Sequence, residues 1–247
     1  MQVDNNKIPK PDRTTSIRKL LKSFVSQNVS TELKEDTQTE MKSVFVIKSA
    51  FKTPFRNLDD KAYQEDMLKI DKKVANEAFK NNKRTLDDYL RGKGFFKYKT
   101  RSYVRLNKIR VLECIELQKE LYGTKTFTVN IIWMPLYVHH DYMARNITYR
   151  LGTIICGHDV WWDYANDSVA HDSFLNVLDA IDQFVIPRFE EYADIEKLKE
   201  YINNLKSLSV NNREWLKEID LYDCNDDIVC ENIDKFKLPK RLMNNLK

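Results

Sequence analysis

The sequence predicts an α+β fold in which an antiparallel β-sheet meander carries helices packed on one face, with helical extensions at both ends of the chain. The apolar residues follow helical spacing before Gly94, alternate from there to about residue 155, and return to helical spacing after residue 173. A block of strands between two groups of helices is typical of α+β proteins. Glycine and proline are scarce, with 5 and 6 residues among 247, which argues against long flexible linkers.

The chain is expected to divide into three regions. Residues 1–57 form a basic N-terminal arm with a short amphipathic helix at 17–25 and a strand or extended segment at 44–51. Residues 58–192 form the α+β core domain. Residues 193–247 form a C-terminal helical extension that packs on the core.

Two helices are expected between the N-terminal arm and the sheet. The first runs from Asp59 towards Asn82, with its apolar residues on one stripe. Thr85 is expected to cap a second, shorter helix, which Gly92 and Gly94 end.

Alternating apolar and polar residues predict the strands of the meander. The expected strands cover residues 95–99, 102–106, 111–119, 127–134 and 147–155. In the fourth strand, Phe127, Val129, Ile131 and Trp133 share one face. Residues 157–164 are expected to form a loop or a sheet edge.

Helical spacing returns after the sheet and predicts helices at 173–186 and 195–205. Pro187 is expected to end or kink the first of them. The apolar residues of the tail, from residue 211 onwards, are sufficient for one or two short helices that dock on the core.

A series of short motifs runs through the middle of the chain. In order, they are Gly94-Phe95-Phe96-Lys97-Tyr98-Lys99, Tyr103-x-Arg105, Phe127-Thr128-Val129-Asn130, Arg150-Leu151-Gly152, Trp161-Trp162 and Ile186-Pro187-Arg188-Phe189-Glu190. This order resembles the bacterial family known only as domain of unknown function 4304, over about residues 85–192. The resemblance implies a compact α+β domain, often a stand-alone bacterial protein, and it brings no catalytic residues and no cofactor.

The charge of the chain is divided unevenly along its length. Residues 1–110 carry 26 basic and 14 acidic side chains, whereas residues 111–247 carry 15 basic and 23 acidic ones. The densest basic stretch, residues 83–110, contains a candidate basic patch made of Lys93, Lys97, Lys99, Arg101 and Arg105. We favour pairing of these cations with the acidic half of the same chain over binding to nucleic acid.

Several classes of protein find no support in the sequence. No signal peptide and no apolar run long enough to span a membrane is evident. Neither a nucleotide-binding glycine loop nor a nucleophile elbow occurs, and no cofactor is expected. The four cysteines are widely spread, which indicates buried thiols in a reducing compartment and therefore a cytoplasmic protein.

Four histidines gather within a short part of the chain, and three of them precede an aspartate. They are His139, His140-Asp141, His158-Asp159 and His171-Asp172. A metal- or His/Asp-dependent hydrolase that uses this 139–171 region is one alternative function. The spacing does not put two histidines on one face of a helix or strand, so we expect no metal centre.

Arg150 is a charge in the middle of a predicted strand, between Tyr149 and Leu151. Such a guanidinium must reach either solvent or a carboxylate. One interpretation is a buried ion pair with Glu113 or Glu116 on a neighbouring strand.

The other interpretation is functional. Here Arg150 opens towards a cleft whose rim consists of Trp161, Trp162 and His158. A planar cation beside large aromatic side chains suits an anionic or peptide ligand. These four residues are the candidate binding site.

With no strong catalytic motif, the sequence favours a non-enzymatic protein of the bacterial cytoplasm that binds another protein. The His/Asp-dependent hydrolase is the alternative from a different class. Nucleic-acid binding through residues 83–110 is a further alternative.

Overall fold

The computed structural model of this chain describes residues 69–121, 123–140, 143, 147–204, 215, 219 and 226–246. The expected helix at 17–25, the expected strand at 44–51 and the first part of the helix after Asp59 lie outside the described residues.

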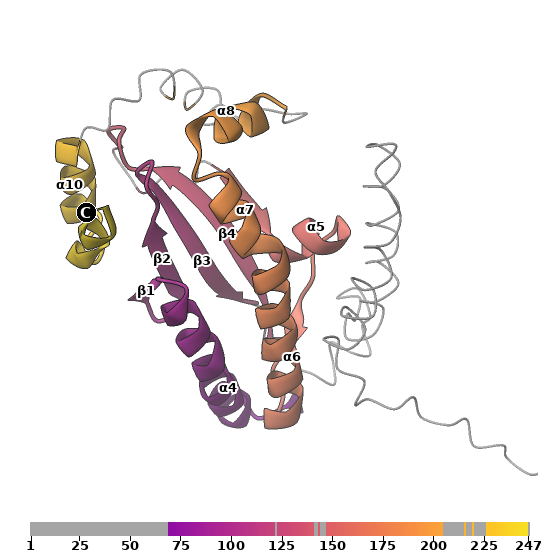
Figure 1. Cartoon of the computed structure of the whole chain (residues 1–247). Helices are drawn as coiled ribbons and strands as arrows, with labels where there is room; N and C mark the ends of the chain where they lie inside the picture. The colour runs from indigo at the N-terminus through magenta and orange to yellow at the C-terminus, as the bar shows by residue number, and fades with distance from the viewer. Residues whose placement is uncertain are drawn as a thin grey trace, which may run out of the picture.

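An antiparallel sheet forms the centre of the described part of the chain (Figure 1). Its strands are β1 (Phe96–Lys99), β2 (Ser102–Leu106), β3 (Val111–Lys119), β4 (Thr126–Pro135), β5 (Ile147–Arg150) and β6 (Trp162–Asp163). The first five follow one another in space as they do in sequence, and β6 pairs with β4 beyond the end of β5. The predicted α+β class and antiparallel meander are therefore confirmed.

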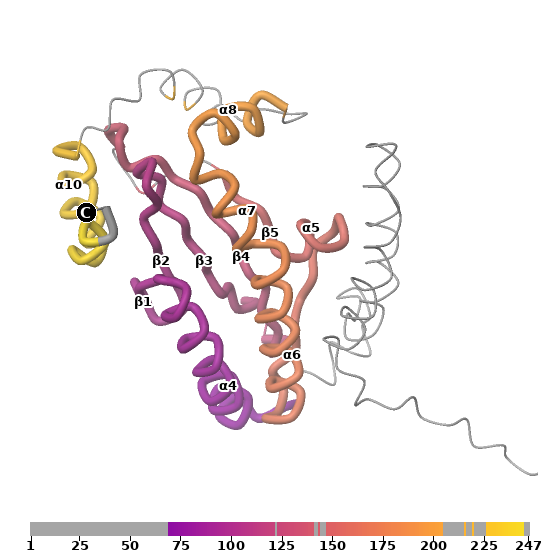
Figure 2. The backbone as a smooth tube through the Cα atoms, viewed as in Figure 1, coloured from indigo at the N-terminus to yellow at the C-terminus, as the bar shows by residue number. Residues whose placement is uncertain are grey.

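Helices cover one face of this sheet. They are α4 (Lys72–Gly92), α6 (Asp167–Ala180) and α7 (Ile186–Glu191), and both Figure 1 and Figure 2 show them crossing the strands. Phe127 of β4 stacks on Phe174 of α6, with 4.9 Å between ring centroids, and Trp133 meets Phe189 of α7 at the same distance. Burial of each such side chain stabilises the fold by roughly 1.5–3 kcal/mol.

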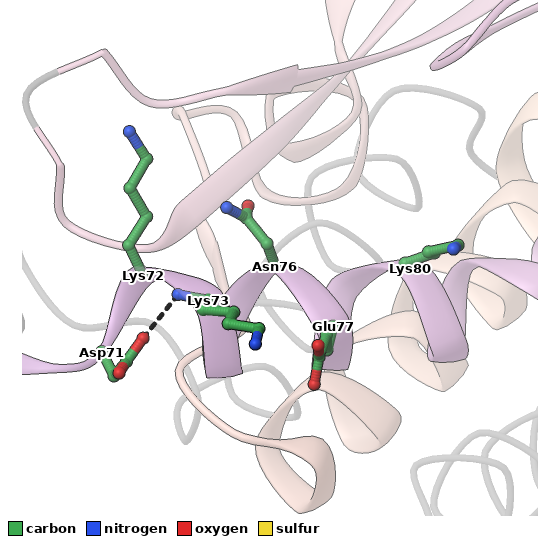
Figure 3. A pocket seen from close by; sticks show the side chains of 6 residues that line it. All are labelled: Asp71, Lys72, Lys73, Asn76, Glu77 and Lys80. Atoms are coloured by element: carbon green, nitrogen blue, oxygen red, sulfur yellow. Dashed lines mark hydrogen bonds between the residues drawn. The ribbon is translucent and has the colours of Figure 1, made fainter.

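One continuous helix, α4, replaces the two helices expected around Thr85. The side chain of Asp71 caps its N-terminus by accepting a hydrogen bond from the Lys73 amide at 2.6 Å (Figure 3). The expectation of a break was wrong because buried residues continue at helical spacing through the whole of α4, while Thr85 is simply exposed on its outer face. The helix ends before Gly94, whose φ of 83° suits glycine.

The strand expected at 147–155 is also corrected, since β5 ends at Arg150 and α5 (Leu151–Cys156) follows at once. Arg150 pairs with Asn130 of β4. A longer β5 would continue beside Thr126 and Phe127, but β6 occupies those positions. The chain therefore leaves the sheet as a short helix.

The helix expected at 173–186 begins earlier, at Asp167, where the Asn166 side chain accepts a hydrogen bond from the Val169 amide. Pro187 does not end the helical path. A π-helical turn (η1, Ile181–Val185) connects α6 to α7, so the missing amide of Pro187 falls in the first turn of α7.

The described part of the C-terminal region contains α8 (Ile195–Asn203), α10 (Asp226–Lys235) and the 3₁₀ helix η2 (Lys240–Leu246). The phenol of Tyr98 donates to the Phe236 carbonyl, and Arg241 lies over the ring of Phe96. Phe95, the neighbour of Phe96 in the chain, contacts Phe189 of α7. Because side chains alternate along a strand, Phe236 and η2 contact the sheet face opposite to the one that α7 covers. None of the helices in the described ranges has the length and apolar character that crossing a membrane would require.

Candidate functional site

A row of polar residues crosses four strands on the sheet face away from α7. Strand register aligns Ser102 of β2, Glu116 of β3, Asn130 of β4 and Arg150 of β5. Directly paired residues of antiparallel strands point to the same face, so these side chains are neighbours. The Asn130 amide donates to Glu116 at 3.3 Å and to Gln118 at 2.9 Å.

The middle of this polar row is buried, because the side chains of Asn130 and Thr128 are almost inaccessible to solvent. The two ends of the row differ, since Arg150 is half-buried and Ser102 is buried. One end is Arg150 on β5, and the other lies at Ser102, beside the turn between β1 and β2.

At the first end, Arg150 lies against an aromatic ring and a carboxylate. Its Nη1 is 3.1 Å from Oδ2 of Asp159, and its guanidinium carbon is 5.1 Å from the ring centroid of Trp161. The Arg150 side chain is 30 % exposed and that of Asp159 is 52 % exposed. We call Arg150, Asp159 and Trp161 the Arg150 surface.

The short helix α5 positions the Arg150 surface. The helix ends at Gly157, whose φ is 79°, and the chain turns there. Residues 158–161 then lie beside the end of β5. Gly152 allows this close return because a Cβ atom there would lie 2.5 Å from the Val160 nitrogen.

The remaining residues of the candidate binding site are placed differently. Trp162 is buried in the core beside Phe127, with 6.1 Å between ring centroids, so it is not a rim residue. His158 is exposed, and its Nδ1 lies 3.1 Å from the Cys156 carbonyl oxygen. The carboxylate beside Arg150 is Asp159, whereas Glu113 pairs with Arg105.

The four histidines contact different partners. His139 lies beside Glu231 of α10, His140 contacts the Pro135 carbonyl, and His171 lies 3.3 Å from Oδ1 of Asn82. Burial lowers the pKa of His140. Within the ranges that the structure describes, no three His, Cys, Asp or Glu side chains are grouped to hold a metal ion.

The candidate basic patch is divided by the fold. Three of its members pair with carboxylates: Arg105 with Glu113 at 2.6 Å, Lys93 with Asp182 at 3.2 Å and Lys97 with Asp87 at 3.6 Å. The other two, Lys99 and Arg101, line a cavity at the second end of the polar row.

The pair of Arg105 and Glu113 belongs to the interior. Burial raises the pKa of Glu113 to about 7, while the Arg105 guanidinium and the Asn107 amide oppose that rise. The guanidinium also lies over the rings of Phe95 and Phe189. This arrangement stabilises the contact between the sheet and α7 and is closed to a ligand.

The fold and these contacts define a class of protein: an α+β domain whose antiparallel sheet carries α4, α6 and α7 on one face and presents an arginine and a tryptophan at its edge. Residues 86–191 match the family described as "Domain of unknown function (DUF4304)", so this part of the chain is similar to that family. The match runs from within α4 to the end of α7. Comparison with curated proteins found no match, and comparison with solved structures found none either.

Proposed function

We propose that the chain is a non-enzymatic protein-binding module that binds its partner through the Arg150 surface. The observation that carries the proposal is the guanidinium of Arg150, held against Trp161 yet still partly exposed. Arginine and tryptophan are enriched among the residues that dominate binding energy at protein interfaces. Stacking on the indole holds the guanidinium in place, which lowers the entropy lost on binding.

The strand that carries Arg150 supports this proposal. In the described part of the chain, β5 lies at the end of the strand order. An edge strand has backbone groups that can pair with an extended segment of a partner. A guanidinium has five N–H donors, so Arg150 can bind a partner carboxylate while it remains beside Asp159.

The Arg150 surface contributes little to the stability of the fold. An ion pair as exposed as Arg150 with Asp159 contributes about 0–1 kcal/mol to stability. The small contribution of this ion pair to folding supports a role of Arg150 in binding.

We extend the proposal to the setting of the protein, a bacterial cytoplasm. The thiols of Cys114, Cys156 and Cys230 are consistent with a reducing compartment. In this proposal residues 58–192 are the core domain, residues 193–247 are an extension packed on it, and residues 1–57 are an N-terminal arm.

Replacing Arg150 with alanine is expected to abolish capture of the partner and to leave folding nearly unchanged. The full-length protein would be used to capture proteins from the cells that produce it. The partner would then be purified, and its dissociation constant measured by calorimetry. We expect affinity to fall by about 2 kcal/mol or more, as at an interface hot spot, while unfolding changes by less than about 1 kcal/mol.

Arg84→Ala is the matched control, because Arg84 is an exposed arginine on α4. It should bind the partner as the unmodified protein does. Unchanged affinity of Arg150→Ala for the same partner would refute the proposed surface. A large loss of stability in that variant would instead assign Arg150 to the fold.

A further inference from the structure

A cavity of about 470 Å³ lies at the Ser102 end of the polar row, beside the β1–β2 turn and the C-terminal half of β3. Its volume is in the range of small-molecule sites. The side chains that the argument uses are those of Lys99, Ser102, Glu116, Gln118 and Leu121, which all line it. We call it the polar cavity.

Four of these side chains share the sheet face away from α4. The register of β1 with β2 shifts between Lys97 and Lys99, so Lys99 pairs with Ser102. Ser102 in turn pairs with Glu116, and directly paired residues point to the same face. Gln118 lies two positions after Glu116 on β3 and shares its face.

Two other cations of the lining point to the opposite face. Nζ of Lys119 donates to Oδ1 of Asn76 on α4 at 2.7 Å. The Arg101 carbonyl oxygen accepts a hydrogen bond from the Leu117 amide, which continues the pairing of β2 with β3. Arg101 directly precedes Ser102, so its side chain points to the face of Lys119. We therefore assign Lys99, and neither of these two, to the polar cavity.

A cation and an anion flank Ser102 in the polar cavity. Lys99 is exposed, and its Nζ lies 4.9 Å from the ring centroid of Tyr98, a contact that leaves its charge in place. Glu116 is half-buried and accepts a hydrogen bond from the Asn130 amide at 3.3 Å. A carboxylate has about four acceptor sites, so Glu116 can accept from a ligand as well.

Neutral groups beside these charges are ready to form hydrogen bonds. The carbonyl oxygen of Gln118 accepts from the Asn130 amide at 2.9 Å, so the Gln118 amide nitrogen, with two N–H donors, points away from Asn130. Thr128 pairs with Gln118 and is buried, and within the described part of the chain its hydroxyl has no hydrogen-bond partner. This face therefore has hydrogen-bonding groups that the sheet itself does not pair.

From this arrangement we infer that the polar cavity binds a free α-amino acid with an apolar side chain. Lys99 and the Gln118 amide bind the α-carboxylate, and Glu116 binds the α-ammonium group. The apolar side chain of the ligand lies against Leu121, which is 89 % exposed. A zwitterion matches a cavity with both signs of charge, whereas Glu116 repels a phosphate dianion. This site is separate from the Arg150 surface and does not depend on the proposed function.

The experiment titrates the full-length protein with L-leucine at pH 7 and measures the heat of binding. We expect saturable binding. N-acetyl-L-leucine lacks the ammonium group and L-leucinamide lacks the carboxylate, so the dissociation constant of each should be about tenfold higher or more.

Two variants test each charge against the ligand that lacks its counterpart. Lys99→Met should weaken binding of L-leucine about tenfold and leave binding of L-leucinamide unchanged. Glu116→Gln should weaken binding of L-leucine similarly and leave binding of N-acetyl-L-leucine unchanged. Lys99 is exposed, and glutamine at position 116 keeps an acceptor for Asn130. Both variants should therefore melt, without ligand, near the temperature of the unmodified protein.

Lys80→Met and Glu77→Gln are the matched controls, because both residues are exposed on α4, which covers the other face of the sheet. They should bind L-leucine as the unmodified protein does. No saturation by L-leucine, or equal affinity in Lys99→Met, Glu116→Gln and the controls, would overturn the inference. Tighter binding of N-acetyl-L-leucine than of L-leucine would also overturn it and assign the cavity to a simple anion.

Discussion

Arg105→Met is expected to lower the free energy of unfolding by about 3–5 kcal/mol at pH 8, because it leaves a buried carboxylate without its cation. The side chain of Glu113 is fully buried and lies 2.6 Å from Nε of Arg105. The same substitution removes the hydrogen bond from Arg105 to the Lys93 carbonyl. Urea denaturation would measure the loss.

The pH dependence gives this prediction a second readout. The pKa of Glu113 is raised to about 7 in the fold, above its ordinary value near 4.5. A raised carboxyl pKa means that stability falls as the pH rises through that interval. Without Arg105 the pKa should rise further, so the cost of Arg105→Met should be largest at pH 8 and smaller at pH 5.

The double variant Arg105→Met/Glu113→Leu is the control for the charge itself. It removes both partners and should recover much of the lost stability, since an apolar pair of similar volume replaces a buried ion pair at little cost. A single variant that loses less than about 1 kcal/mol at pH 8 would show that water reaches Glu113. A double variant as unstable as the single one would show that packing, and not charge, is responsible.

Gly152→Ala is expected to lower the free energy of unfolding by about 3 kcal/mol, near the upper end for overpacked sites. The added Cβ would lie 2.5 Å from the Val160 nitrogen and 2.6 Å from the Val160 Cβ. Backbone cannot rotate away as a flexible side chain can, so α5 and residues 158–161 must separate. Partner binding at the Arg150 surface should weaken for the same reason.

Gly92→Ala provides the matched control, because no heavy atom lies within 4 Å of a Cβ built there. Gly92 is the last residue of α4, and alanine should stabilise the helix by about 0.5–1 kcal/mol. If Gly152→Ala unfolds at the same urea concentration as the unmodified protein, then α5 does not pack closely on Val160.

The sequence alone determined the architecture of the sheet. β2 and β3 have the bounds that the sequence predicts, although residues of both faces are buried along most of each strand. The order of the short motifs also indicated the family over nearly the residues that match it. Both signals are local, since they depend on neighbours in sequence.

Part of the candidate site could also be predicted from local pattern. A charge at position 150, inside an apolar strand, required a partner or solvent wherever the strand lay. Adjacent tryptophans required that at least one of them pack inward, but their spacing did not say which. The register of β6 with Phe127 decided that Trp162 is buried, and Trp161 therefore lies beside Arg150.

The tertiary structure decided where elements end and which charges meet. β5 stops at Arg150 because β6, twelve residues later, takes the next position beside β4. Asp159 meets Arg150, and Glu113 meets Arg105, because α5 and the strand register bring them together. Strand ends and ion pairs of this kind depend on which of two distant segments packs at a given position. The local spacing of residues in the sequence does not determine which segment does so.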